Sequence, residues 1–246
     1  MKYLREIGEY VLLMIQTLKK PEKWFIFRRQ LVVNFKQIGT ESIGIVAIIS
    51  FFLGGIVAIQ LAYNIDSPFI PKSIIGFSTR TMLVLEVSPT LLSMILTGKV
   101  GSRIASEIGT MRITEQIDAL RVMGVNPASY LILPKIVASV LYFPVLVIFS
   151  IFLGLMGGYA AGAITGLVPP ADYIIGVREW FAPFNLVYSM IKTVVFAFII
   201  ASVASYKGYS VKGGSVEVGQ ASTDGVVTAN ILIIIFDLIL TQMLLT

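Results

Sequence analysis

The sequence contains no histidine and no cysteine, and charged residues make up only 13% of its 246 positions. The missing side chains exclude a thiol nucleophile, an imidazole base and a Cys/His zinc site. Average soluble domains carry about 25% charged residues, so this chain has too little charge to cover a water-facing surface. Its hydrophobic content of 56% points instead to a membrane protein.

Two glycine-containing segments lack the residues that would make them catalytic. The segment from Gly213 to Glu217 does not end in the glycine of a Gly-x-Ser-x-Gly nucleophile elbow. The segment from Gly214 to Gly219 has P-loop spacing, but Gln220 follows where a Lys would meet the β- and γ-phosphates. If the protein uses ATP, a partner must hydrolyse it.

Five apolar stretches are long enough to cross a bilayer, which takes about 20 residues of helix. They are residues 42–63, 74–96, 136–163, 186–206 and 226–245. We therefore predict an all-α integral membrane protein whose residues 41–246 form a five-span domain. Glycines in the third span and small residues in the fourth recur every fourth position, which predicts close helix packing. They are Gly154, Gly158, Gly162 and Gly166, then Ser189, Thr193, Ala197, Ala201 and Ser205.

The distribution of cations predicts the orientation. Of the 19 Lys and Arg residues, fifteen lie before the first span, between the second and third, or between the fourth and fifth. The other four are Lys72, Arg80, Arg178 and Lys192. The positive-inside rule therefore predicts a cytoplasmic N-terminus and, after five spans, a C-terminus outside. The net charge of +5 follows from this arrangement, and no nucleic-acid partner is implied.

Residues 1–40 predict an amphipathic helix that lies along the cytoplasmic leaflet. Its apolar residues share one face: Leu4, Ile7, Val11, Met14, Ile15 and Leu18. Glu6 and Glu9 argue against a signal peptide, and Pro21 with Trp24-Phe25 predicts a turn at headgroup level. The alternative is a short cytosolic helix that packs on a partner.

A charged segment between the second and third spans predicts a second amphipathic helix, over about residues 105–123. Its apolar stripe is Ile113, Ile117, Leu120 and Met123. Its charged residues are Arg112, Glu115, Asp118 and Arg121. Gly124 before Asn-Pro predicts the helix end. Such a helix is either a docking element for a soluble partner or a solvated connector.

Two carboxylates lie inside predicted spans, Glu86 and Asp237. A carboxylate in the bilayer costs about 2.5–3.5 kcal/mol on insertion scales, so both should face a bundle interior or a wet cavity. For Glu86 the alternatives are a polar group in a substrate cavity and a helix–helix hydrogen bond near Pro89. The residues that flank a lipid path at this level are Gln60, Leu61, Leu83 and Val87.

The central motifs resemble the MlaE-type (YrbE-type) permeases of bacterial lipid ABC transporters, which are related to a chloroplast lipid permease. The resemblance rests on five motifs: Glu86-x-x-Pro89, Gly98-Lys-Val-Gly-Ser102, the run from Glu107 to Leu120, Met123-Gly-Val-Asn-Pro127, and Lys207-Gly-Tyr209. Asp237 also matches, whereas Leu85 stands where some members have Arg.

The resemblance implies a homodimeric permease of the bacterial inner membrane that moves phospholipid or a similar molecule. Cytoplasmic ATPase subunits would hold ATP and Mg²⁺, and a periplasmic MCE-domain protein would bind lipid outside. The fold would be an N-terminal interfacial helix plus five transmembrane helices, with a cytoplasmic coupling helix between the second and third spans. ATPase-coupling residues would be Glu107, Gly109, Arg112, Thr114, Glu115 and Asp118. Lipid-binding residues would be Gln60, Leu61, Leu83, Glu86 and Val87.

Two other classes of protein remain as alternatives. A secondary transporter would need a coupling-ion site and commonly shows inverted repeats, and no repeat is evident. A non-transporting membrane scaffold would explain a docking helix but not an acidic residue inside a span. Co-purification of an ATPase discriminates between these classes and the lipid permease.

Overall fold

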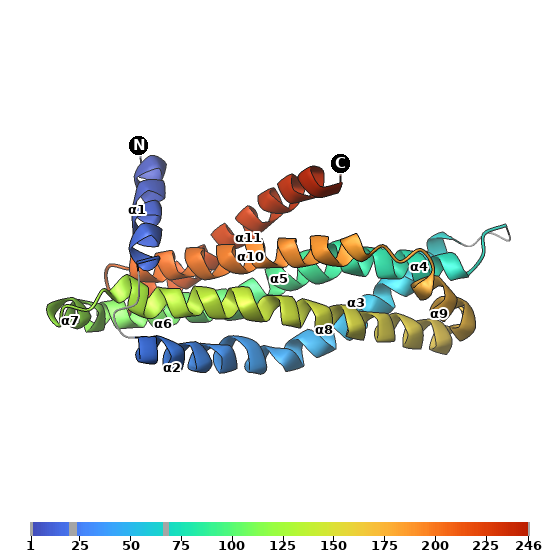
Figure 1. Ribbon diagram of the computed structural model, residues 1–246, viewed down its shortest axis with the longest axis horizontal. Coiled ribbons are helices and arrows are strands. Elements are labelled where there is room, and N and C mark those ends of the chain that lie inside the picture. The colour runs from blue at the N-terminus through green and yellow to red at the C-terminus, as the bar shows by residue number, and fades with distance from the viewer. Residues whose placement is uncertain (1, 20–23, 66–68, 246) are drawn as a thin grey trace. The chain divides into compact units, whose positions relative to one another are not determined.

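Long apolar helices dominate the computed structural model, which describes residues 2–19, 24–65 and 69–245 (Figure 1). Within those residues all regular structure is helical, because a backbone in lipid must satisfy its hydrogen bonds internally. Five helical runs are long and apolar enough to cross a membrane: Trp24–Asn64, Ser73–Ile113, Ala128–Thr165, Pro183–Tyr209 and Ser215–Leu244. The five predicted spans are confirmed.

Most runs extend well beyond the predicted spans. The first begins at Trp24 rather than at residue 42, and the second continues to Ile113 rather than ending near residue 96. The apolar stretches mark only the part that suits hydrocarbon, whereas the helical backbone continues into more polar sequence. Trp24 and Phe25, which were predicted to form part of a turn, are the first residues of α2 (Trp24–Asn34). Pro21 lies outside the described residues.

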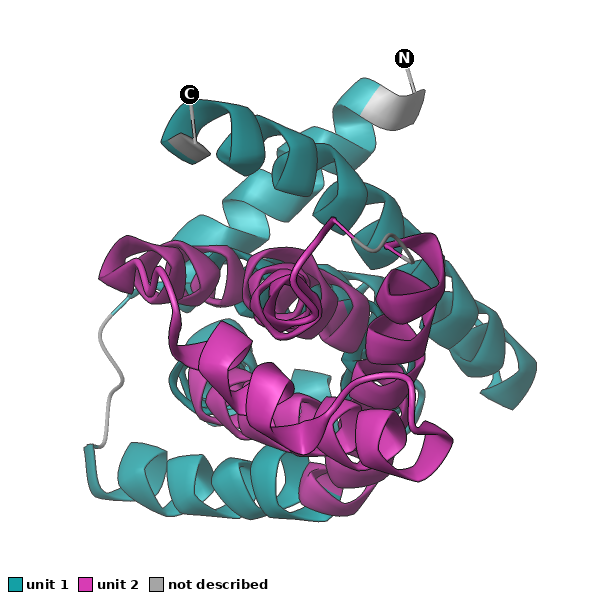
Figure 2. Ribbon diagram, turned by 90° about the vertical axis from the view of Figure 1, so that its right-hand side faces the viewer, with its two compact units in different colours: residues 1–41, 94–142, 195–246 teal, residues 42–93, 143–194 magenta. Residues whose placement is uncertain are grey.

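The chain divides into two compact units (Figure 2). Unit 1 comprises residues 1–41, 94–142 and 195–246, and unit 2 comprises residues 42–93 and 143–194. The long helices α8 (Leu133–Thr165) and α10 (Pro183–Tyr209) each contribute residues to both units.

Unit 2 contains α3 (Ile43–Asn64), α4 (Ser73–Met82), η3 (Leu83–Leu91) and α9 (Pro170–Arg178), with parts of α8 and α10. Glycines allow α3 and α8 to touch, because a side chain at Gly54 would collide with the carbonyl group of Gly154. Gly158 similarly faces the Tyr173 hydroxyl group. The predicted packing role is wrong only for Gly166, which has a φ of +69° and ends α8 with no atom within 4 Å of an added Cβ. All five small residues predicted to pack in the fourth span are buried.

Pro89 shapes η3, which is a π-helix. Proline has no N–H, so it cannot donate to the carbonyl group of Leu85 four residues earlier. A run of wider helical turns accommodates this defect without ending the helix. The Leu85 carbonyl group is thereby left without its usual α-helical donor.

Unit 1 contains the N- and C-terminal helices and the charged segment. Its elements are α1 (Lys2–Thr17), α2, η1 (Phe35–Gly39), η4 (Thr97–Gly101), α6 (Ser102–Ile113), α7 (Gln116–Val122), η5 (Ala128–Ile132) and α11 (Ser215–Leu245). Short elements η2 (Thr40–Ser42) and α5 (Leu92–Leu96) lie at the unit boundaries. Helix α6 packs on α11, and Gly208 of α10 approaches the Ala105 backbone of α6.

Candidate functional site

The predicted helix over residues 105–123 is divided in two. Helix α6 ends at Ile113, and Glu115 adopts a φ of 61° before α7 begins at Gln116. This left-handed residue breaks the stripe expected to run from Ile113 to Met123. Ile117 is buried, whereas Met123 is exposed beyond the end of α7. Gly124, with a φ of 78°, follows as predicted.

An ion-pair network fixes α7 against α6 and α10. The Arg112 guanidinium donates to Asp118 Oδ1 at 2.9 Å, and Arg121 lies 3.4 Å from the same oxygen. Arg121 also donates to the Tyr209 hydroxyl group at 2.8 Å and lies over its ring. Two of the predicted coupling residues, Arg112 and Asp118, therefore bind each other within the chain.

The other predicted coupling residues have different surroundings. Glu107 accepts a hydrogen bond from buried Lys135 at 2.7 Å, and Gly109 packs so that an added Cβ would lie 3.1 Å from Val218. The exposed Thr114 hydroxyl group donates to the Thr110 carbonyl oxygen at 2.8 Å. Glu115 is exposed, and its carboxylate forms no ion pair in the part of the chain that the structure describes.

Helix α1 contacts α10 and the segment that follows α7. The Tyr10 hydroxyl group donates to Ser202 Oγ at 2.9 Å, and the Asn126 amide donates to the Gln16 carbonyl oxygen at 3.0 Å. Burial raises the pKa of the Tyr10 phenol, and the hydrogen bond with Ser202 lowers it in part. The predicted apolar face is exposed at Leu4, Ile7, Val11, Ile15 and Leu18, whereas Met14 is buried.

Glu86 forms an ion pair with Lys192 on α10 in unit 2. The Lys192 ammonium donates to Glu86 Oε1 at 2.8 Å and to the Leu85 carbonyl oxygen at 3.3 Å. Thr90 donates to the other carboxylate oxygen at 3.2 Å. The Lys192 side chain is 0% exposed, while that of Glu86 is 46% exposed. The proline defect in η3 thus provides one acceptor for a buried cation.

The remaining lipid-binding predictions lie on different faces. Gln60 is exposed on α3, and Leu61 packs against a core cluster formed by Ala58, Ala62, Ile75, Val168 and Tyr173. Leu83 is buried, and an added Cβ at Gly154 would lie 3.0 Å from it. Val87 is also buried. Of the five residues, only Gln60 and Glu86 present substantial polar surface.

Sequence reasoning missed two buried cations in unit 2. We counted Lys192 and Arg80 among the cations of the outer side, yet both are buried within unit 2. Arg80 donates to the carbonyl oxygens of Val177 and Glu179 at 2.7 Å, and to that of Trp180 at 3.2 Å. For Lys192 a signal was present, because it is the single charged residue within the predicted span 186–206.

Comparison with known proteins gives matches along nearly the whole chain. The family described as Permease MlaE matches residues 31–243. A probable ABC transporter permease protein of Rickettsia prowazekii is 33% identical over 98% of this chain and 93% of its own length. The intermembrane phospholipid transport system permease protein MlaE of Haemophilus influenzae is 29% identical over 87% of this chain and 82% of its own.

A plant relative also matches. The chloroplast protein TRIGALACTOSYLDIACYLGLYCEROL 1 of Arabidopsis thaliana is 30% identical over 93% of this chain and 64% of its own length. The family match includes α6, α7 and both partners of the Glu86–Lys192 pair. The motif resemblance is confirmed, and this multi-pass membrane protein belongs to the MlaE family of ABC transporter permeases.

Proposed function

We propose that the chain is the permease subunit of an ATP-driven transporter that moves phospholipid, or a similar hydrophobic molecule, between the bacterial inner membrane and the outer envelope. The observation that carries the proposal is the MlaE family match over residues 31–243. The names of two relatives support the proposal. One is a probable ABC transporter permease, which supports ATP-driven transport, and the other belongs to an intermembrane phospholipid transport system, which supports a lipid substrate.

The proposed assembly contains two copies of this chain, cytoplasmic ATPase subunits and a periplasmic MCE-domain protein. The chain lacks the P-loop lysine, so ATP and Mg²⁺ belong to the ATPase. The cation distribution supports a cytoplasmic N-terminus and α6–α7 segment and a periplasmic C-terminus.

Coupling to the ATPase is assigned to the junction of α6 and α7. The helical run that starts at Ser73 ends at Ile113, directly before the exposed Thr114 and Glu115. Arg112 and Asp118 hold α7 in place, which leaves Glu115 as the carboxylate available to a partner. Glu107 and Gly109 support this segment through Lys135 and Val218.

The lipid path is assigned to the surface beside Glu86. Its carboxylate is half-exposed next to a buried ammonium group, which gives a polar site within a span. A headgroup that carries both charges or several hydroxyl groups would find complementary partners there. Gln60 would add an amide, whereas partly buried Leu61 and buried Leu83 and Val87 would shape the wall behind the path.

Charge reversal at Glu115 tests the proposed function. Glu115→Lys should weaken ATPase binding and abolish assembly-dependent ATP turnover while the permease still inserts. Glu179→Lys is the matched control, because it makes the same charge change at an exposed loop assigned to the opposite side. Normal ATPase binding by Glu115→Lys would contradict the coupling assignment. Purification without any ATPase would favour a secondary transporter or a scaffold.

A further inference from the structure

A pocket of about 520 Å³ lies in unit 1 beside α2. One wall is apolar: Phe25, Ile26, Val33, Met111 and Leu131. The polar lining is Arg29, Gln30, Asn34, Gln37, Glu107, Tyr130 and Lys135. The pocket shares no residue with the Glu86–Lys192 pair, so it is a separate feature of the molecule.

The innermost charge of this pocket is the Lys135 ammonium group, whose side chain is 5% exposed. It donates to Glu107 at 2.7 Å and to Asn34 Oδ1 at 3.3 Å. A buried ammonium group is costly unless it is paired, and Glu107 supplies the balancing charge. These contacts fix a cation at a defined position in the lining.

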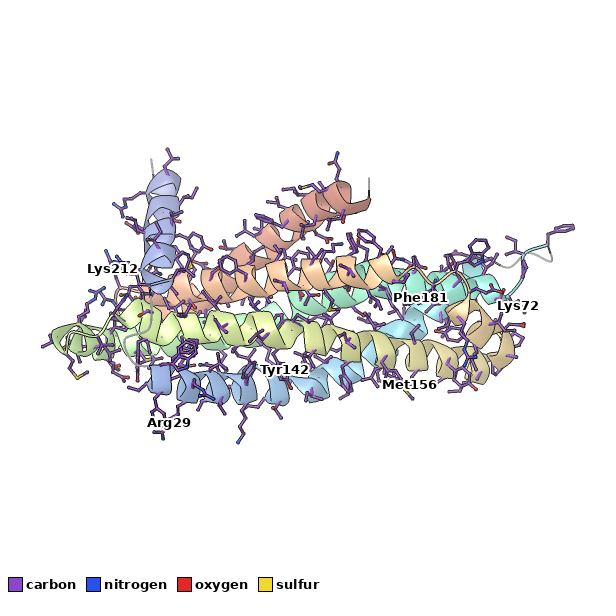
Figure 3. The ribbon with its side chains drawn as sticks, viewed as in Figure 1. Arg29, Lys72, Tyr142, Met156, Phe181 and Lys212 are labelled. Carbon is purple, nitrogen blue, oxygen red and sulfur yellow. The ribbon has the colours of Figure 1, made fainter. Side chains whose placement is uncertain are left out.

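A second cation, Arg29, adds charge that the lining does not balance. Its side chain is exposed on α2 (Figure 3), and it forms no ion pair with any residue in the described ranges. The pocket lining therefore contains two cations, Arg29 and Lys135, and one carboxylate, Glu107. The planar guanidinium group is suited to bidentate binding of phosphate oxygens.

The surroundings of Arg29 favour a lipid over a soluble anion. Trp24 and Phe27 stack with ring centroids 5.2 Å apart at the start of α2. Phe25 and Val33, which line the pocket, are also exposed. Aromatic residues at the end of a spanning helix are typical of headgroup level. The exposed apolar residues of α2 can hold acyl chains.

We propose that this pocket binds one anionic phospholipid, with its phosphate on Arg29 and its acyl chains along α2. The Lys135–Glu107 pair forms the polar floor of the site, at its buried end. The remaining N–H donors of Lys135 and the side-chain amides of Gln30 and Gln37 suit glycerol hydroxyl groups. The site is independent of ATP and of transport, so it can be tested even if the proposed function fails.

The experiment measures lipid retention by the full-length chain in detergent. The protein is incubated with equal amounts of phosphatidylglycerol and phosphatidylcholine of identical acyl chains, and bound lipid is counted by native mass spectrometry. Wild type should retain phosphatidylglycerol preferentially. Arg29→Gln should retain several-fold less, whereas Arg28→Gln should not differ from wild type. Arg28 is the matched control, because it is also exposed on α2 but does not line the pocket.

Two further measurements test whether the bound phosphate belongs to a lipid or to a soluble molecule, and whether the polar floor contributes to binding. Glycerol 3-phosphate in excess should not displace the lipid, and Lys135→Gln should lower retention because it removes a cation from the pocket lining. Equal losses in Arg28→Gln and Arg29→Gln would overturn the proposal in favour of general surface attraction. Displacement by glycerol 3-phosphate, or no preference between the two lipids, would also overturn it.

Discussion

At the scale of single residues, the Glu86–Lys192 pair is asymmetric. The ammonium group is fully buried, while the carboxylate keeps nearly half of its side-chain surface. Losing one partner of a buried pair leaves the other charge without compensation, and the cost depends on whether water can reach it. The Glu86 side chain is open at the surface of the chain, whereas that of Lys192 is not.

We therefore predict unequal effects on stability. Glu86→Leu should lower the free energy of unfolding by about 3 kcal/mol, because it isolates a buried ammonium group. Lys192→Met should cost less, since the remaining carboxylate is half-exposed, and the double variant should recover part of the loss. Thermal unfolding in detergent measures all three. A larger loss in Lys192→Met than in Glu86→Leu would show that the carboxylate is the desolvated partner.

The sequence identified one half of this pair. Glu86 was conspicuous because a carboxylate in an apolar span is expensive, and the same argument applied to Lys192. We assigned Lys192 to the outer side because it lies near the start of the fourth span. The two residues are 106 positions apart, so no local pattern connects them.

At the scale of elements, the contact between α3 and α8 depends on backbone approach. Gly54 faces the Gly154 carbonyl group, and Gly157 faces that of Phe51. Helices in lipid associate through close packing rather than through a hydrophobic driving force. Small residues at the contact therefore stabilise it more than large apolar side chains would. The four-residue glycine spacing predicted close packing by α8, but it did not predict that α3 would be the partner helix.

Alanine substitution in α3 tests the contact. Gly54→Ala should destabilise the protein by about 2 kcal/mol or more, because the new methyl group has no space. Gly44→Ala in the same helix should not, since an added Cβ there meets nothing within 4 Å. Thermal unfolding and the yield of folded protein provide the comparison. Similar behaviour of the two variants would contradict the packing described for Gly54.

The short helix α7 offers a second prediction at this scale. It has seven residues, too few to be stable alone, so its contacts with α6 and α10 hold it. Tyr209→Phe removes the acceptor for Arg121 at a cost of about 1 kcal/mol, which should raise amide exchange in α7 roughly fivefold. Tyr206→Phe is the control, because Tyr206 contacts Glu9 on α1. Unchanged exchange in Tyr209→Phe would show that the ion pairs suffice.

At the scale of the whole molecule, composition and charge distribution determine which segments span the membrane and which side the others are expected to occupy. Each of five helical runs contains an apolar stretch with few charges, and most cations lie in segments assigned to one side. Exposed apolar residues on α1 agree with a helix that lies at the interface. The orientation itself stays a prediction from the positive-inside rule.

Cysteine labelling tests that orientation, and the chain has no cysteine to interfere. In intact cells with a permeable outer envelope, Glu179→Cys and Thr246→Cys should react with a membrane-impermeant maleimide. Gln116→Cys should react only after the inner membrane is opened. Gln116 and Glu179 are both exposed, so a difference between them reports sidedness rather than burial. The reverse pattern would invert the predicted topology.

The sequence by itself determined the number of spans, the helical class and the family, because each depends on local composition or on contiguous motifs. In lipid, the length of an apolar run is enough to require a helix. Only the tertiary structure decided which polar side chains meet: Lys192 with Glu86, Lys135 with Glu107, and Arg121 with Tyr209. It also placed the break at Glu115, which a continuous helical stripe had concealed. These features depend on partners from separate helices, so periodicity along one segment could not reveal them.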